Sequence, residues 1–284
     1  MYTPRLLAAI LGLLPALCGQ DLKTAASLYQ HTDYAGALRV LESLTPLGAP
    51  AWLLIGKSRL MKGDLKQATE AFEKAASLVP ADSEAMLWLG RSWGRRAESA
   101  NPLIAPIYAV RARDYFEKAA AMNPANRDAL GDLFEYYLEA PVFLGGGLKK
   151  AQMVAARIAE FDPPESHYDY ARIARKGGDL AEAERHLRLS VKLGPNQIGH
   201  VLALARILSE EGRAEECQAT LAAAERISPG SPRVLYERAR IYLAEGSHRD
   251  EALELLKKYL QCNLTPDDPS RESVEKILWR AQGG

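Results

Sequence analysis

Apolar residues along residues 52–80 recur at helical spacing in two short blocks that are separated by a turn. The residues on the two apolar faces are Trp52, Ile55, Gly56 and Arg59 in the first block and Leu65, Ala68, Phe72, Ala75 and Leu78 in the second. Gly63 and Asp64 between the blocks supply a helix stop and an N-cap, and Pro80 ends the second block. The stretch therefore predicts a hairpin of two short amphipathic helices.

The same pattern continues along most of the chain, with a small residue in each helix of a pair and often a proline at the end of the pair. The predicted hairpins span residues 20–48, 49–82, 83–126, 127–163, 164–197, 198–231 and 232–266. A final amphipathic stretch within 267–284 carries Val274, Ile277 and Leu278 and predicts one more helix. Repetition at this length indicates a stack of similar units rather than one or two globular domains.

The order of Trp52, Gly56, Ala68, Phe72 and Pro80 resembles the signature of the tetratricopeptide repeat (TPR) family, whose repeats are about 34 residues long. The resemblance covers roughly residues 21–281. It implies an all-α, right-handed α-solenoid of about seven helix hairpins with a C-terminal capping helix. It also implies a protein or peptide ligand, bound in a concave groove that is lined by the first helix of each hairpin.

Two predicted hairpins are longer than the others. The third has 22 residues from Gly90 to Ala112, whereas the second has 12 from Gly56 to Ala68. The surplus, SANPLIAPIYAVR, predicts either two longer helices or a loop that protrudes from the edge of the array. This segment is a candidate contact surface, and the alternative is that it serves only as a spacer.

The fourth hairpin is about five residues longer than expected, and the surplus falls in PVFLGGG at residues 141–147. Its three glycines precede Lys149 and Lys150, which invites comparison with a phosphate-binding loop. No predicted strand precedes the glycines, and the Gly-Lys-Ser/Thr ending of such loops is absent. A turn between two helices is the interpretation that we favour.

The N-terminus differs from the rest of the chain. An uncharged run of 13 residues, Leu6 to Cys18, follows Arg5. As a helix at ~1.5 Å per residue it reaches about 20 Å, which is shorter than the core of a bilayer. We expect residues 1–19 to be a signal peptide, so the protein would be exported and either periplasmic or secreted.

Two alternatives for the N-terminus are a membrane anchor that stays uncleaved and a lipid anchor on Cys18. Leu17 argues against the lipid anchor, because lipoprotein signals carry a small residue before their cysteine. Cleavage before Gly19 or before Gln20 fits the small residues in this region.

The charges are balanced, with 36 Lys and Arg residues against 36 Asp and Glu residues. No overall field therefore directs the chain to nucleic acid or to an anionic membrane. After removal of residues 1–19 only Cys217 and Cys262 remain, too few for a disulfide framework. Cys217 stands at the small-residue position of its hairpin, so we expect a buried thiol rather than a disulfide.

Motifs for catalysis are absent from the sequence. The five histidines fall in four predicted hairpins and form no ligand set of the zinc types. Glu182 and His186 are one helical turn apart, a spacing typical of an exposed pair. The nucleophile-elbow, zinc-protease and dinucleotide motifs do not occur. The sequence therefore predicts no catalytic residue, no metal and no cofactor.

Two rows of residues on the first helices are candidates for the ligand groove. The position after the small residue is mostly basic: Lys57, Arg91, Arg172, Arg206 and Arg240, with Glu135 in the fourth hairpin. The position three residues before the small residue is mostly apolar: Leu53, Leu87, Gly131, Tyr168, Leu202 and Tyr236. Such rows would suit an extended segment with carboxylates and apolar side chains. The alternative is pairing within each helix, as the spacings of Arg206 with Glu210 and Arg240 with Glu237 allow.

These observations predict a non-catalytic scaffold or adaptor whose ligand is a protein or peptide. An acidic ligand is what the basic row indicates if it faces the groove, and pairing within the helices remains the alternative. Neither nucleic acid nor a stable membrane span is expected in the mature protein. A second hypothesis is an accessory subunit of a bacterial-type envelope assembly or secretion complex, which would dock through the two insertions and the convex face. An enzyme or a small-molecule binder is the least supported hypothesis. The sequence sets neither the partner nor the oligomeric state.

Overall fold

The structure is a computed structural model that describes residues 20–246, 248–265 and 268–282. Helices and short connections account for these residues, and no strand occurs among them. The all-α class expected from the sequence is therefore confirmed. The predicted signal peptide at residues 1–19 lies outside the described part of the chain.

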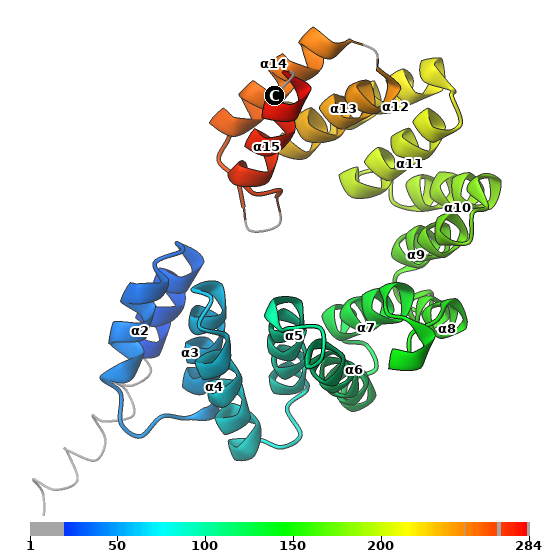
Figure 1. Cartoon of the computed structure of the whole chain (residues 1–284). Helices are drawn as coiled ribbons and strands as arrows, with labels where there is room; N and C mark the ends of the chain where they lie inside the picture. The colour runs from blue at the N-terminus through cyan, green and yellow to red at the C-terminus, as the bar shows by residue number, and fades with distance from the viewer. Residues whose placement is uncertain (1–19, 247, 266–267, 283–284) are drawn as a thin grey trace, which may run out of the picture. The chain divides into compact units, whose positions relative to one another are not determined.

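Contacts divide the chain into two compact units, Met1–Val154 and Ala155–Gly284. Residues 20–30 form the first described helix. The next elements are α2 (Tyr34–Glu42), α3 (Ala49–Met61), α4 (Leu65–Leu78), α5 (Ser83–Ser99), α6 (Ala105–Met122), α7 (Arg127–Glu139), the 3-10 helix η1 (Val142–Leu144) and α8 (Leu148–Ile158), which crosses into the second unit. The second unit continues with α9 (Pro163–Lys176), α10 (Leu180–Leu193), α11 (Ile198–Glu210), α12 (Ala214–Ile227), α13 (Pro232–Glu245), α14 (Arg249–Gln261) and α15 (Arg271–Ala281). Neighbouring helices pack as hairpins, such as α3 with α4 and α9 with α10 (Figure 1).

Two hairpins of the first unit, α3 with α4 and α5 with α6, are held by an aromatic ring that lies against a glycine. A Cβ atom added to Gly56 would stand 2.4 Å from Cε1 of Phe72, and one added to Gly90 would stand 2.4 Å from Cδ1 of Phe116. The ring therefore occupies the space that a larger residue would need. The small residue and the phenylalanine of the repeat signature are two halves of one contact between the helices.

Polar side chains begin many of these helices. Each accepts a hydrogen bond from a backbone N–H in the first turn and so satisfies a donor that has no partner within the helix. The capping residues are Asp33, Asp82, Asn126, Asp162, Asp179 and Ser270.

The surplus residues of the third hairpin lengthen both of its helices. Helix α5 has 17 residues and α6 has 18, against 13 and 14 for α3 and α4. A short connection joins the two, and the Asn101 side chain accepts hydrogen bonds there from the N–H groups of Leu103 and Ile104. Of the two forms that the sequence allowed, the longer helices are the one observed.

The surplus of the fourth hairpin forms η1 and a glycine turn. The amides of Gly145, Gly146 and Gly147 donate to the carbonyls of Val142, Pro141 and Tyr137, at N···O distances of 2.9, 3.2 and 2.7 Å. All three amides are therefore used inside the turn, and none remains to hold a phosphate. The interpretation of this segment as a turn between helices is confirmed.

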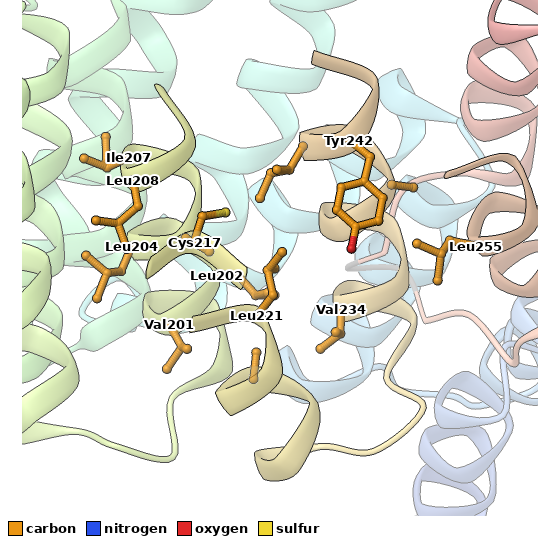
Figure 2. Packing of buried hydrophobic residues seen from close by; sticks show 14 of the residues in the cluster. Val201, Leu202, Leu204, Ile207, Leu208, Cys217, Leu221, Val234, Tyr242 and Leu255 are labelled. Carbon is orange, nitrogen blue, oxygen red and sulfur yellow. The ribbon is translucent and has the colours of Figure 1, made fainter. Parts of the chain in front are cut away.

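The second unit contains a continuous core between α9 and α15. Figure 2 shows its central part, where Val201 and Leu204 of α11 lie near Cys217 and Leu221 of α12, with side chains from α13 and α14 beside them. Helix α15 joins this core through the fully buried Val274. The hydroxyl of Tyr259 on α14 donates to the carbonyl of Pro269 at 2.7 Å and holds the segment that leads into α15.

Both cysteines in the described part of the chain are free thiols. Cys217 is buried and Cys262 is partly exposed, and burial raises the pKa of the Cys217 thiol to about 11. The expectation of a buried thiol at Cys217 is confirmed. Among the helices of the described residues, none is long and apolar enough to cross a membrane.

Candidate functional site

The five predicted basic residues lie on first helices of hairpins, two in the first unit and three in the second. They are Lys57 on α3, Arg91 on α5, Arg172 on α9, Arg206 on α11 and Arg240 on α13. Each follows the small residue at which its helix packs against the second helix of the hairpin. The repeated packing thus sets a cation at an equivalent position of these five helices, whereas α7 carries Glu135 there.

In the first unit the cations pair with acids of the next hairpin rather than of their own helix. Lys57 Nζ lies 2.6 Å from Glu84 on α5. Arg91 Nε lies 2.5 Å from Asp132 on α7, and its Nη2 lies 3.6 Å from Asp128. Burial raises the pKa of Asp132, and the hydrogen bond from Arg91 opposes that rise. These pairs link consecutive hairpins.

In the second unit one carboxylate serves two cations. Arg206 Nη2 lies 2.7 Å from Oε1 of Glu237 on α13, whereas Arg240 Nη1 lies 4.0 Å from the same oxygen. Glu210, the expected partner of Arg206, pairs instead with Arg175 at 2.6 Å. Half of the Arg240 side chain (51%) is exposed. Glu237 is therefore shared between two guanidinium groups, of which Arg240 is the more exposed.

Aromatic rings lie beside these cations. The ring centre of Trp88 is 4.8 Å from Lys57 Nζ and 4.9 Å from Arg91 Cζ. The guanidinium of Arg172 lies 5.9 Å from the ring centre of Tyr168, and that of Arg240 lies 5.7 Å from the ring centre of Tyr236. Contacts of this kind stabilise each cation by about 0.5–1 kcal/mol at an exposed site and fix the direction of its side chain.

The predicted apolar row is wrong for three of its members. Leu53, Leu87 and Leu202 are only 8%, 2% and 3% exposed, so they belong to the core. Residues three apart lie on the same face of a helix. Each leucine stands three positions before a buried small residue and therefore lies on the buried face of its helix. Tyr168 and Tyr236 are half-buried and keep part of their rings at the surface.

We call the first-helix face the set of surface residues that remains after this correction. In the first unit it consists of Lys57, Trp88 and Arg91, and in the second unit of Tyr168, Arg172, Arg206, Tyr236 and Arg240. Trp88 was missed by the sequence analysis. Its signal is its place in the sequence, since it stands three residues before Arg91, where a helix brings both side chains to one side.

Ser190, His200 and Glu165 lie in a row that has the composition of a hydrolase triad. Nδ1 of His200 is 2.7 Å from Oγ of Ser190, and Nε2 of His200 is 3.1 Å from Glu165. The Ser190 side chain is fully buried, and its Oγ also donates to the carbonyl of Pro164 at 2.7 Å. The Ser190 hydroxyl is thus enclosed, and the network ties α9, α10 and α11 together.

A pair of histidines, His167 and His186, lies in the same unit. Nδ1 of His167 is 2.9 Å from Nδ1 of His186, and Glu182 lies 3.3 Å from Nε2 of His186. Burial, aided by the nearby charge of Arg185, lowers the pKa of both rings. Within the described residues, no group of three or more His, Cys, Asp or Glu side chains is placed to hold a metal ion.

The repeated hairpins and the repeated face define a protein built from stacked helical repeats. The sequence profile of the tetratricopeptide repeat matches residues 22–83, 53–100 and 202–269, which together make up more than half of the chain. The chain belongs to the tetratricopeptide repeat family. No curated protein matches the sequence.

Solved structures agree with this fold. A tetratricopeptide repeat protein from Parabacteroides merdae matches with a TM-score of 0.67 at 15% identity, over 93% of this chain and 98% of its own. A TPR protein from Thermus thermophilus, TTC0263, matches with a TM-score of 0.54 at 18% identity, over 67% of this chain and 98% of its own. Pseudomonas aeruginosa pilF matches with a TM-score of 0.51 at 17% identity, over 81% of this chain and 97% of its own. At such identities these matches show the fold alone.

Proposed function

We propose that the protein is an exported, non-catalytic adaptor that binds an extended segment of a partner polypeptide along the part of the first-helix face that lies in the second unit. The TPR scaffold suggests a role in protein–protein interaction. The signal-like sequence of residues 1–19 supports export to the periplasm or the exterior. The occluded hydroxyl of Ser190 and the absence of catalytic motifs support a role in binding rather than in catalysis.

One observation carries the choice of an acidic ligand. Glu237 is shared between Arg206 at 2.7 Å and Arg240 at 4.0 Å, so its single charge opposes two guanidinium groups. A carboxylate of the ligand would complete the second pair at Arg240, where bidentate geometry is open to it. The ring of Tyr236, 5.7 Å from Arg240, would pack against a neighbouring apolar side chain of the ligand.

The test of this proposal replaces Arg172 and Arg240 by Gln in one variant. Both residues stand beside half-buried tyrosines, and Gln keeps a polar side chain of similar length. We expect co-purification of the partner from the native envelope fraction to fall at least tenfold, with the far-UV circular dichroism and the melting temperature nearly unchanged. The matched control is Arg226→Gln on α12, an exposed residue on a second helix. Equal recovery of the partner with both variants would contradict the proposal.

Export is tested separately by N-terminal sequencing of the protein from its native cell fractions. A mature chain that begins at Gly19 or Gln20 in the periplasm or medium agrees with the proposal. A chain that retains Met1 in the cytoplasm contradicts it.

A second candidate function is favoured by the two insertions. The connection between α5 and α6 exposes 87% of Leu103, and η1 exposes 79% of Val142 and 82% of Phe143. Exposed apolar side chains next to one another are typical of docking sites. In this function the protein is an accessory subunit of an envelope assembly or secretion complex. Val142→Ser with Phe143→Ser would then abolish assembly and leave binding at the first-helix face intact.

A further inference from the structure

An open pocket of about 410 Å³ lies in the first unit, where the N-terminal end of α4 meets the connection between α5 and α6. Its lining includes Lys66 of α4, Arg96 of α5, Asn101 of the connection and Tyr108 of α6. The volume is within the range of about 300–1,000 Å³ that ligand pockets occupy. None of the residues of the first-helix face lines this pocket.

Arg96 is held rigidly at this pocket without a carboxylate partner. Its Cζ lies 4.1 Å from the ring centre of Trp93 and 4.7 Å from that of Tyr108. Its two terminal nitrogens donate to neutral oxygens, at 3.5 Å to Thr69 and 3.3 Å to Tyr108. In the part of the chain that the structure describes, no Asp or Glu pairs with it. The guanidinium is thus aligned by aromatic contacts while its charge stays unbalanced.

Asn101, Tyr108 and Lys66 add further donors to the lining, whereas the Ser99 hydroxyl donates to the carbonyls of Arg95 and Arg96 on its own helix. Asn101 uses its Oδ1 to accept from Leu103 and Ile104, so its Nδ2 group is the one left for a ligand. The Tyr108 hydroxyl accepts from Arg96 and keeps its own proton to donate. The exposed Lys66 adds a second cation, and none of the lining residues is acidic. A pocket with two cations and only neutral partners is complementary to an anion.

Apolar side chains stand beside these donors. Ile104 lines the pocket and is 38% exposed, and Leu103 and Ile107 nearby on the same segment are 87% and 56% exposed. A small inorganic anion would leave these side chains in water. A polypeptide that carries an acidic side chain between apolar ones would cover them and pair with Arg96 at the same time.

We propose that this pocket binds an Asp or Glu side chain of a partner polypeptide, with the apolar residues next to that acid packed on Ile104 and Ile107. The planar carboxylate would receive two N–H groups from Arg96, whose plane is already fixed by Trp93 and Tyr108. This site lies at the end of a lengthened hairpin and is separate from the first-helix face. It would give the third hairpin a contact of its own with a partner.

The test uses the full-length protein and an array of 12-residue peptides with a central Glu, flanked by random combinations of Leu, Ile, Ala and Ser. Two matched arrays carry Gln or phosphoserine in place of the central Glu. We expect the protein to bind Glu peptides with Leu or Ile beside the acid, and to bind the Gln peptides at least tenfold more weakly. Dissociation constants of the best peptides are then measured by titration calorimetry.

Arg96→Gln should weaken binding of these peptides at least tenfold, and Lys66→Gln, at an exposed position that cannot disturb the fold, about threefold. The matched control is Arg95→Gln, because Arg95 is adjacent on α5 but pairs with Glu98 at 3.7 Å and does not line the pocket. The titrations use the background variant with Arg172→Gln and Arg240→Gln, because the first-helix face is itself proposed to bind acidic segments. Binding that persists in this background and falls with Arg96→Gln belongs to the pocket.

Three results would overturn the proposal. One is equal binding of Glu and Gln peptides or the absence of any binding peptide. The second is unchanged affinity in both Arg96→Gln and Lys66→Gln. The third is stronger binding of the phosphoserine peptides than of the Glu peptides, which would assign the pocket to a phosphorylated ligand.

Discussion

Arg206 on α11 and Glu237 on α13 form an ion pair between consecutive hairpins, with Nη2 2.7 Å from Oε1 and only 13% of the Glu237 side chain exposed. Lys57 with Glu84 and Arg91 with Asp132 have the same relationship in the first unit. Three basic residues of the first-helix face, Lys57, Arg91 and Arg206, therefore serve two purposes. They link neighbouring repeats, and they present guanidinium or ammonium groups at the surface.

The link between Arg206 and Glu237 predicts a measurable loss of stability. Glu237→Gln leaves the Arg206 charge partly buried without its partner, and we expect the free energy of unfolding to fall by about 1–3 kcal/mol. Glu254→Gln is the control, because Glu254 is 62% exposed and pairs with Lys257 one turn away on the same helix. The free energy of unfolding of this control should change by no more than about 0.5 kcal/mol. Urea denaturation measures the free energy of unfolding of both variants. Equal losses would show that the pair between hairpins contributes no more to stability than an exposed pair on one helix.

The contact between Gly90 and Phe116 predicts opposite effects for two substitutions on one helix. Gly90→Ala places a methyl group 2.4 Å from the Phe116 ring, so we expect a loss of about 1–3 kcal/mol in the free energy of unfolding. At Gly94, four residues later on α5, nothing lies within 4 Å of an added Cβ. Gly94→Ala should therefore increase stability by about 0.5–1 kcal/mol, since alanine favours a helix. Thermal melts in which Gly90→Ala and Gly94→Ala both raise, or both lower, the melting temperature would contradict this packing.

The histidine pair predicts a dependence of stability on pH. Burial lowers the pKa of His167 and His186 in the folded chain. The unfolded chain, with histidine pKa values near 6.5, then binds protons more readily than the folded one. The contribution of the buried, neutral histidine rings to the free energy of unfolding is fully present above about pH 6.5. It is lost as the pH falls through the lowered pKa values of the folded chain.

We therefore expect the melting temperature of the wild type to fall between pH 8 and pH 5 by more than that of a variant with His167→Gln and His186→Gln. His31→Gln, at an exposed histidine of the first unit, should keep the wild-type dependence. Identical pH profiles for all three proteins would count against the burial of the pair.

The enclosed serine predicts a structural rather than a chemical role for the Ser190 network. A fluorophosphonate probe should leave Ser190 unlabelled, because its side chain is fully buried and bonded to Pro164 and His200. Ser190→Ala should lower the free energy of unfolding by about 1–3 kcal/mol, since it leaves a buried His200 nitrogen without this partner. Mass spectrometry detects labelling, and a labelled Ser190 would reopen the question of catalysis.

The sequence predicted the hairpins well because their main contact is encoded locally. Gly56 and Phe72 lie within one hairpin, and their spacing alone places the ring against the glycine. The partners of the basic row were predicted less well. Glu210 stands one turn from Arg206 on the same helix, yet the structure joins Arg206 to Glu237, whose position depends on how one hairpin packs on the next. No spacing within a single repeat contains that information.

The pocket at the third hairpin was beyond sequence analysis for a similar reason. The surplus length marked the segment, but the alignment of Arg96 depends on Trp93, Tyr108 and Thr69, which come from three different helices. The error on Leu53, Leu87 and Leu202 had another cause. Their spacing of three from a buried small residue places them on the inner face of the helix rather than at the surface.

The central claim, that a partner polypeptide lies along the part of the first-helix face in the second unit, is tested most directly by photocrosslinking in the native envelope. A benzophenone amino acid replaces Tyr236 on α13 in one protein and Arg226 on α12 in another. The account predicts a crosslinked polypeptide at position 236 that disappears when Arg172 and Arg240 are replaced by Gln, and none at position 226. Equal crosslinking at both positions, or a product at 236 that persists in the double replacement, would contradict it.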